Sequence, residues 1–303
     1  MQKIQKEYEQ KKAEAHENLK KELGEVAHTA TENAGKTIVE KVETHKRNVE
    51  KQTIEDQVRD HLRGFTRTIP SFLMAYGDEN TTLATFDQII PDEVFREVTS
   101  ISLDEFRFLR DGGGYIDPET GKPGYYEGKL FDEVVFNDSV KEFSTLKEKL
   151  SNYFDAEQKE DIFDYIPPQK TNQIFTPKKV VKEMVDMLAE ENPGCFNDSK
   201  ATFADLYMKS GLYIAEIVTR LYNSPALKEQ FPDDVERLNH IYAKQVYGLA
   251  PTEIIYRIAR TFVLGFSDQI HIASDNIRLC DSLKYAEEGT LEAKLKELFP
   301  ELK

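Results

Sequence analysis

The first 62 residues carry one narrow stripe of apolar positions on a background of lysine and glutamate. The apolar residues recur at steps of mostly three or four, the spacing that places side chains on one face of an α-helix. They include Ile4, Tyr8, Ala15, Leu19, Leu23, Val26, Ala30, Ala34, Ile38 and Val42. Because proline is absent from this stretch, we predict one long charged helix over residues 1–62, acting as a solvated connector. The steps do not hold a heptad, which disfavours the alternative of a dimeric coiled coil.

Between residues 63 and 165 the pattern changes to short helical segments with more aromatic side chains, which predicts a mainly helical junction domain. Two glycine-rich turns, at residues 110–114 and 121–124, bracket a short excursion that indicates an exposed hairpin. Residues 130–150 return to helical periodicity. Ile166-Pro167-Pro168 is expected to be extended, because the residue before a proline is disfavoured in the α region. We therefore place a domain boundary between residues 165 and 166.

From residue 171 onward, segments of helical and strand periodicity alternate. Short apolar strands are predicted at residues 201–206, at 245–249 and, around a turn, at 271–273 with 277–279. Amphipathic helices precede and separate them, the first with Thr176 as N-cap and Pro177 in its first turn. Alternating β and α units are typical of a parallel sheet with helices on its faces. The predicted fold class is therefore α/β, with a helical N-terminal region followed by an α/β domain over residues 166–303.

Composition narrows the class of protein. The chain has 303 residues, and 55 acidic against 40 basic side chains give a net charge of −15, which disfavours strong non-specific binding of nucleic acid by this chain alone. The two cysteines form no CxxC pair and the six histidines show no HExxH spacing, which argues against a disulfide framework or a His/Cys metal site. No segment approaches the roughly 18 apolar residues of a membrane span, and no signal-peptide core follows Met1. We expect a cytoplasmic protein.

The segment around Asp205 has the most informative chemistry. Asp205 closes a predicted strand, a tight loop ends in Ser210-Gly211, and a helix opens directly afterwards. Ligands of open α/β sheets bind outside the carboxyl ends of the strands. A glycine permits close approach of the backbone, and a helix N-terminus favours a ligand carboxylate. The pattern indicates a site for a nucleotide-like ligand, with an ordinary strand–loop–helix turn as the alternative.

Four short motifs, in this order, resemble those of adenine-specific DNA methyltransferases of the gamma type. Gln173-Ile174-Phe175-Thr176-Pro177 resembles their QxFTP segment, and residues 205–211 resemble their DPxxGSG loop. Residues 246–249 resemble the strand of their second motif, and residues 280–283 resemble their third. The closer resemblance is to helicase–methylase polypeptides of restriction–modification systems, and it covers roughly residues 55–285.

This resemblance implies a partial Rossmann-like domain that binds S-adenosylmethionine (SAM), within a bacterial restriction–modification enzyme that methylates adenine in DNA. The residues carried over to SAM binding are Phe175, Thr176, Pro177, Asp205, Ser210, Gly211 and Asp281. The implied partners are DNA, contacted mainly by regions outside this chain, and other domains or subunits of the enzyme.

Three features of the sequence depart from the pattern of this family. Lys209 stands where the family has the first glycine of the loop, and it either crowds the ligand or reaches its carboxylate. Ala250 stands where an acidic residue contacts the ribose hydroxyls, so that Glu253 would have to replace it or the contact is missing. The catalytic (D/N)PP(Y/F) tetrapeptide, which in this family binds the adenine amino group and stacks the flipped base, does not occur after Asp281. We therefore predict weak SAM binding and no methylation of DNA by this chain alone.

Two further function classes stay open. Asp117, Glu127 and Lys129 have the D-x9-E-x-K spacing of metal-dependent nucleases, in which two carboxylates hold a divalent ion and the lysine assists the water. Here they fall in a turn rich in Gly, Pro and Tyr. The other class is a non-enzymatic connector or interaction fragment of a restriction enzyme, with a SAM-like domain that binds nothing.

Overall fold

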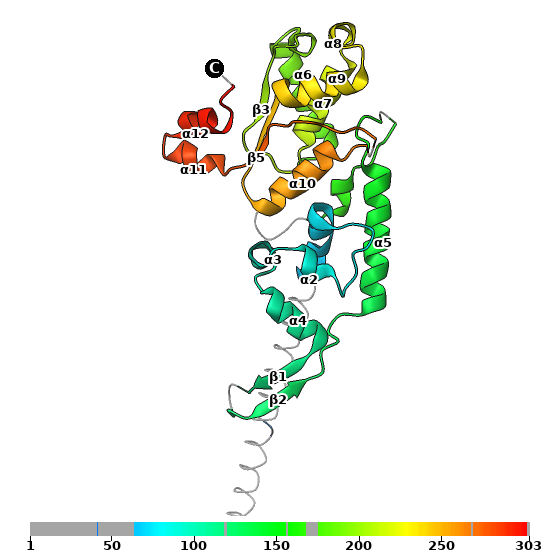
Figure 1. Ribbon diagram of the computed structural model, residues 1–303, viewed down its shortest axis with the longest axis vertical. Helices are drawn as coiled ribbons and strands as arrows, with labels where there is room; N and C mark the ends of the chain where they lie inside the picture. The colour runs from blue at the N-terminus through cyan, green and yellow to red at the C-terminus, as the bar shows by residue number, and fades with distance from the viewer. Residues whose placement is uncertain are drawn as a thin grey trace, which may run out of the picture. The chain divides into compact units, whose positions relative to one another are not determined.

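The structure is a computed structural model that describes residues 41, 64–117, 120–155, 157–167, 175–267 and 269–301 (Figure 1). The chain divides into two compact units, residues 1–63 and 64–303. The helix predicted for residues 1–62 lies outside the described residues, apart from Lys41, which is helical. The second unit is mixed α/β and contains both the predicted junction helices and the sheet.

Residues 64–166 of this unit, called the helical part below, are held together by phenylalanine rings. Residues 64–76 are helical. The elements that follow are α2 (Phe86–Ile89), α3 (Asp92–Thr99), α4 (Leu103–Asp111), α5 (Glu133–Leu150) and the 3-10 helix η1 (Ile162–Tyr165). Phe72, Phe86, Phe95 and Phe106 are fully buried, and the ring centroids of Phe72 and Phe95 lie 5.4 Å apart. A fully buried phenylalanine side chain contributes roughly 1.5–3 kcal/mol, so burial of these four rings is a large contribution to the stability of the helical part.

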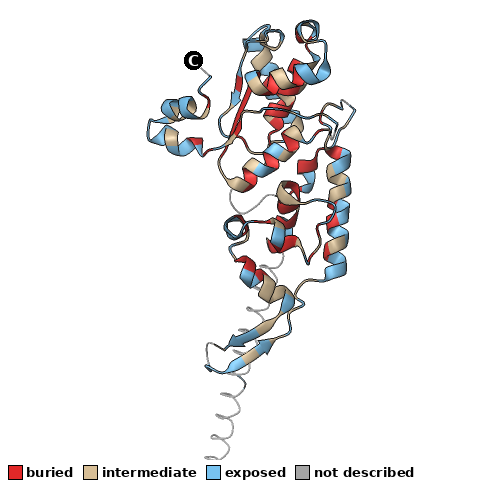
Figure 2. Ribbon diagram, viewed as in Figure 1, coloured by how far each residue is buried: buried red, intermediate tan, exposed pale blue. Residues whose placement is uncertain are grey.

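The predicted exposed hairpin is confirmed. Strands β1 (Gly113–Ile116) and β2 (Pro123–Tyr126) pair antiparallel, and each tyrosine of one strand faces a glycine of the other. Tyr125 is 73% exposed, and Figure 2 shows the hairpin as mostly exposed. The glycines matter here because a Cβ at Gly124 would lie 2.7 Å from the Tyr115 ring.

The predicted parallel sheet is also confirmed. Strands β3 (Phe203–Asp205), β4 (Val246–Ala250) and β5 (Ile277–Leu279) pair in parallel in the order β3-β4-β5. Helix α7 (Leu212–Asn223) follows β3, and α10 (Glu253–Leu264) follows β4. The other elements are α6 (Lys178–Glu191), the 3-10 helix η2 (Cys195–Asn197), α8 (Pro225–Gln230), α9 (Asp234–His240), the π-helix η3 (Ile241–Gln245), α11 (Ser282–Glu287) and α12 (Leu291–Leu298).

Two local predictions in this region are wrong. Residues 271–273 are not a strand. The Asn239 side chain of α9 hydrogen-bonds to their backbone, and its Oδ1 accepts the Ala273 amide at 2.8 Å. Helix α6 begins at Lys178 with Pro177, not Thr176, as N-cap, because the backbone of Pro177 is extended (ψ 143°).

The sheet is covered on both faces. Alternate residues of β4 point to opposite sides: Val246 and Ala250 belong to the main core with α7 and α10, whereas Tyr247 and Leu249 form a smaller cluster with Phe299. The ring centroids of Tyr247 and Phe299, which follows α12, lie 5.1 Å apart.

The helical part and the sheet share one hydrophobic core. Within it, the hydroxyl oxygens of Tyr153 and Tyr242 lie within hydrogen-bond distance of each other and of the carbonyl oxygen of Val263, at 3.0 and 2.8 Å from the latter, so one hydroxyl donates to Val263 and the other donates to its neighbouring hydroxyl or to the same carbonyl. Ile166 has the extended backbone expected before proline (φ −105°, ψ 102°). The domain boundary placed there stays a prediction. Within the described residues, no helix has both the length and the apolar character needed to cross a membrane.

Candidate functional site

The candidate site lies at the carboxyl edge of the parallel sheet. The three strands end at Asp205, Ala250 and Leu279, and because they run in parallel these ends meet at one edge. In open α/β sheets this is the edge where ligands bind. The loop after β3, the N-terminus of α10 and the N-terminus of α11 surround it.

The loop after β3 folds back over the end of β4. Met208 is fully buried, and its amide donates a 2.7 Å hydrogen bond to the carbonyl oxygen of Leu249. Its sulfur lies so close to Gly248 that a Cβ there would be 2.9 Å away. The Asp205 carboxylate accepts the Tyr207 amide at 3.2 Å, and burial raises the pKa of this carboxyl group. Asp205 is therefore held in a desolvated position at the start of the loop.

Ser210 and Gly211 join this loop to α7. The buried Ser210 hydroxyl accepts the Leu212 amide at 3.3 Å. Gly211 is the N-cap of α7 with a left-handed backbone (φ +85°), and a Cβ there would lie 2.6 Å from the Val263 Cγ2 atom. The glycine is thus required by the packing of α7 against α10.

Asp281 lies across the same edge from Asp205. It is exposed, and its carboxylate accepts the Leu283 amide at 3.3 Å as N-cap of α11. The next residue, Ser282, donates its hydroxyl to the carbonyl oxygen of Leu206. Because β4 lies between β3 and β5, this bond closes the chain over the end of the central strand. The structure therefore brings Asp205, Ser210, Gly211 and Asp281 to one edge.

The QxFTP-like segment packs, at its described end, against the helical part. Residues 168–174, including Gln173 and Ile174, lie outside the described residues. Phe175 packs on Phe163 of η1 with ring centroids 4.8 Å apart, and Phe163 packs on Phe262 at 4.9 Å. Phe262 is nine residues along α10 from Glu253, or about 13 Å at the rise of an α-helix. Phe175 is thus anchored through Phe163 to the C-terminal half of α10, and Thr176 and Pro177 lead from it into α6. Their role in SAM binding stays a prediction.

A polar cluster that sequence reasoning missed lies where α10 begins. Ala250 is fully buried at the end of β4, and Glu253 pairs with Arg257 at 2.8 Å. From the helical part, Tyr76 and Glu97 reach the same place: the Arg257 guanidinium lies 5.7 Å from the Tyr76 ring centroid. Burial, with the nearby Glu253 carboxylate, raises the pKa of Tyr76 to about 12. Glu97 is an exposed residue of α3, and partial desolvation of its carboxyl group raises its pKa. No sequence motif predicts this cluster, because its two halves are separated by about 150 residues of chain.

The nuclease-like triple is not assembled. The register pairs Gly113 with Tyr126 and Ile116 with Pro123, so Asp117 follows at the tip of the hairpin and Glu127 at its base. Strands rise about 3.4 Å per residue, which separates the two by roughly 17 Å. Ligands of one divalent ion lie within about 2.6 Å of it. Across the described ranges, no group of three or more His, Cys, Asp or Glu side chains is placed to hold a metal ion.

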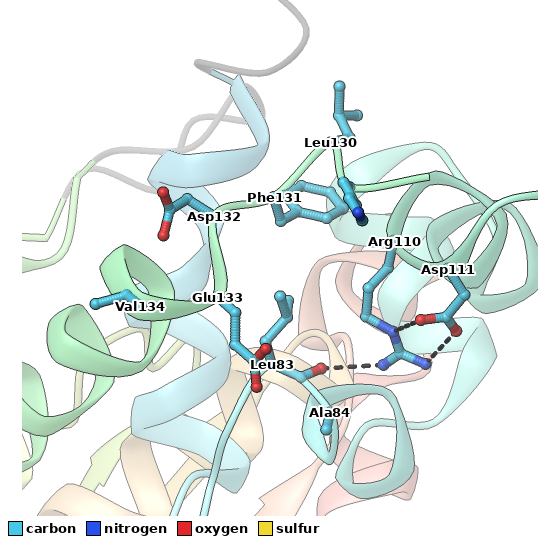
Figure 3. A pocket seen from close by; sticks show the side chains of 10 residues that line it. Leu83, Ala84, Arg110, Asp111, Leu130, Phe131, Asp132, Glu133 and Val134 are labelled. Carbon is cyan, nitrogen blue, oxygen red and sulfur yellow. Dashed lines mark hydrogen bonds and ion pairs between the residues drawn. The ribbon is translucent and has the colours of Figure 1, made fainter. Parts of the chain in front are cut away.

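A surface pocket of about 650 Å³ near the base of the hairpin is lined by residues of the helical part (Figure 3). Among its lining residues, the half-buried Arg110 is already paired with protein groups. The guanidinium donates to both carboxylate oxygens of Asp111, to Asp87 at 2.5 Å and to the carbonyl oxygen of Leu83 at 3.0 Å. We assign these contacts to packing of α2 against α4.

No protein-family model, no curated protein and no solved structure matches this chain.

Proposed function

We propose that residues 166–303 form the SAM-binding part of a Rossmann-like methyltransferase domain that serves methylation of adenine in DNA within a restriction–modification enzyme. The observation that carries this proposal is the β3-α7-β4-α10-β5 unit, with Asp205, Ser210-Gly211 and Asp281 at its carboxyl edge. Parallel βαβαβ units of this kind form the nucleotide-binding half of doubly wound folds. The motif resemblance supplies the identity of the ligand.

The residues at this edge fit the methionine part of SAM. Burial raises the pKa of Asp205, and an ammonium group placed beside a desolvated carboxylate stabilises its charged form. Gly211 offers no side chain to cap α7, so the helix N-terminus, with its partial positive charge, is suited to a ligand carboxylate. Bound SAM would supply an electrophilic methyl group, and the chain's own residues would bind and orient the cofactor.

Methyl transfer needs a partner segment in this proposal. The adenine amino group has to be held near attack distance and flipped from the duplex, and the tetrapeptide that performs this in the family does not occur after Asp281. With a net charge of −15, this chain also offers little attraction to DNA. Catalysis and target recognition are therefore assigned to other domains or subunits.

Equilibrium dialysis with tritiated SAM tests the proposal. We expect saturable retention by the chain and displacement by S-adenosylhomocysteine. With unmethylated genomic DNA present, we expect no transfer of label to the DNA. Absence of any retention would overturn the proposed function, and label in the DNA would overturn the assignment of catalysis to other segments.

A connector without a ligand is the second candidate, favoured by the packing of the loop itself. The Met208 side chain occupies the space above Gly248, and Gly211 is explained by its contact with Val263. In this alternative, the edge is a closed structural turn. The same dialysis separates the two, since a connector retains no SAM.

A further inference from the structure

We propose that Tyr76 and Glu97, from the helical part, form the subsite that binds the ribose hydroxyls of the adenosine cofactor. This inference rests on the proposed function, because it concerns the ligand of the same carboxyl edge. It assigns one wall of the site to a part of the chain that lies outside residues 166–303.

The cluster lies at the carboxyl edge, where β4 ends and α10 begins. Strand β4 ends at Ala250, and α10 begins at Glu253 with Thr252 as its N-cap, so these residues stand at the carboxyl edge beside the loop after β3. The side chain of Ala250 is a fully buried methyl group, which forms no hydrogen bond with a diol. A carboxylate for the ribose therefore has to come from another element.

The two acidic side chains near Tyr76 differ in their partners. Glu253 forms an ion pair with Arg257 at 2.8 Å. Glu97 has no cationic partner within the described ranges, and the Thr252 side chain lies against its carboxylate. Of the two carboxylates near Tyr76, Glu97 is thus the one left to accept hydrogen bonds from a ligand.

The Tyr76 hydroxyl is the other half of the subsite. Its oxygen atom is buried and has no hydrogen-bond partner among the residues that the structure describes. A buried hydroxyl without a partner is unfavourable and calls for an explanation. A ligand hydroxyl between Tyr76 and Glu97 would satisfy it, since a phenol both donates and accepts while a carboxylate accepts only.

The charges around Tyr76 also fix the chemical class of the ligand group. Glu97 and Glu253 both disfavour an anion such as a phosphate. Arg257, which lies over the Tyr76 ring, is paired with Glu253, so the Glu97 carboxylate and the Tyr76 hydroxyl are left to receive hydrogen bonds from the ligand. An uncharged group that donates hydrogen bonds fits best. The vicinal hydroxyls of a ribose are such a group.

The experiment is a calorimetric cycle with two probes, S-adenosylhomocysteine and its analogue without ribose hydroxyls, on five proteins. The proteins are wild type, the test variants Glu97→Gln and Tyr76→Phe, and two controls. Glu93→Gln, at an exposed position of α3, is the control for Glu97→Gln, and Tyr125→Phe, at an exposed position of the hairpin, is the control for Tyr76→Phe. We expect Glu97→Gln and Tyr76→Phe to weaken the natural probe about tenfold, the range for a hydrogen bond to a charged group. Neither variant should weaken binding of the analogue, and the controls should behave as wild type.

Tyr76→Phe also separates binding from folding. Because the hydroxyl has no partner within the described residues of the free protein, its removal should leave the thermal unfolding midpoint unchanged or higher. If both variants bind the natural probe as their controls do, or lose both probes equally, the subsite is overturned while the proposed function stands. If wild type binds neither probe, the proposed function fails and the subsite falls with it.

Discussion

Gly211 and Val263 pack directly against each other, so that a Cβ atom at Gly211 would lie 2.6 Å from the Val263 Cγ2 atom. This contact sets the distance between the N-terminus of α7 and the last turn of α10. Gly211 also has a left-handed backbone, with φ +85°. Two independent constraints therefore require glycine at the residue that opens the candidate site.

Gly211→Ala is expected to lower the free energy of unfolding by about 2–4 kcal/mol, from backbone strain and steric overlap together. Gly194 is the matched control: its φ is +84° and nothing lies within 4 Å of its Cβ position. Gly194→Ala should cost only the strain, about 1 kcal/mol. Urea denaturation measures both. Equal losses in the two variants would show that the contact with Val263 is not restrictive.

Asp161 is expected to make stability depend on pH between about 4 and 6. Asp161 is 5% exposed as a residue, and burial raises the pKa of its carboxyl group from 3.8 to about 6 although the carboxylate accepts the Phe163 amide at 2.6 Å. The folded state therefore binds the proton more tightly, so stability is highest below pH 4 and is lost as the pH rises through about 6. The loss amounts to at most about 3 kcal/mol, since one pKa unit corresponds to roughly 1.4 kcal/mol.

The check is the unfolding free energy of wild type and Asp161→Asn at pH 4, 5, 6 and 7. Asparagine keeps the side-chain oxygen that caps η1 but does not titrate in this range. The difference between the two proteins should shift in favour of Asp161→Asn as the pH rises. A difference that is constant with pH would contradict the buried, titrating carboxyl.

Plasmid DNA is expected to stay intact when it is incubated with this chain and Mg²⁺ or Mn²⁺. The reason is geometric, because Asp117 and Glu127 lie at opposite ends of the hairpin. Agarose gels of supercoiled, nicked and linear DNA measure the outcome. Cleavage that disappears in Glu127→Ala would mean that these residues do assemble an ion site.

The α/β part was predictable because its signals are local. Ile214, Ala215, Ile217 and Val218 share the buried side of α7, and each predicted strand of the sheet that formed is a short apolar run before or after such a helix. The hairpin was equally predictable from its glycines, which admit the facing tyrosines. Local pattern and tertiary packing agree at these positions, so periodicity was sufficient.

The errors and omissions arise where distant contacts decide. Residues 271–273 have strand-like composition, yet the Asn239 side chain binds their backbone. The cluster of Tyr76 and Glu97 with the start of α10 has no sequence spacing to detect, because it depends on how the helical part packs on the sheet. The reason for Gly211 was likewise hidden: the sequence indicates a ligand loop, and the structure adds a helix contact.

Binding of SAM at the carboxyl edge is tested most directly by isothermal titration calorimetry on wild type and Asp205→Asn. The control is Asp138→Asn, which replaces an exposed aspartate of α5. Wild type and Asp138→Asn should bind SAM with the same affinity. Asp205→Asn should bind about tenfold more weakly or worse, because the ligand ammonium loses its charged hydrogen-bond acceptor. Equal affinity in all three proteins, or no binding by wild type, would contradict a SAM site built on Asp205.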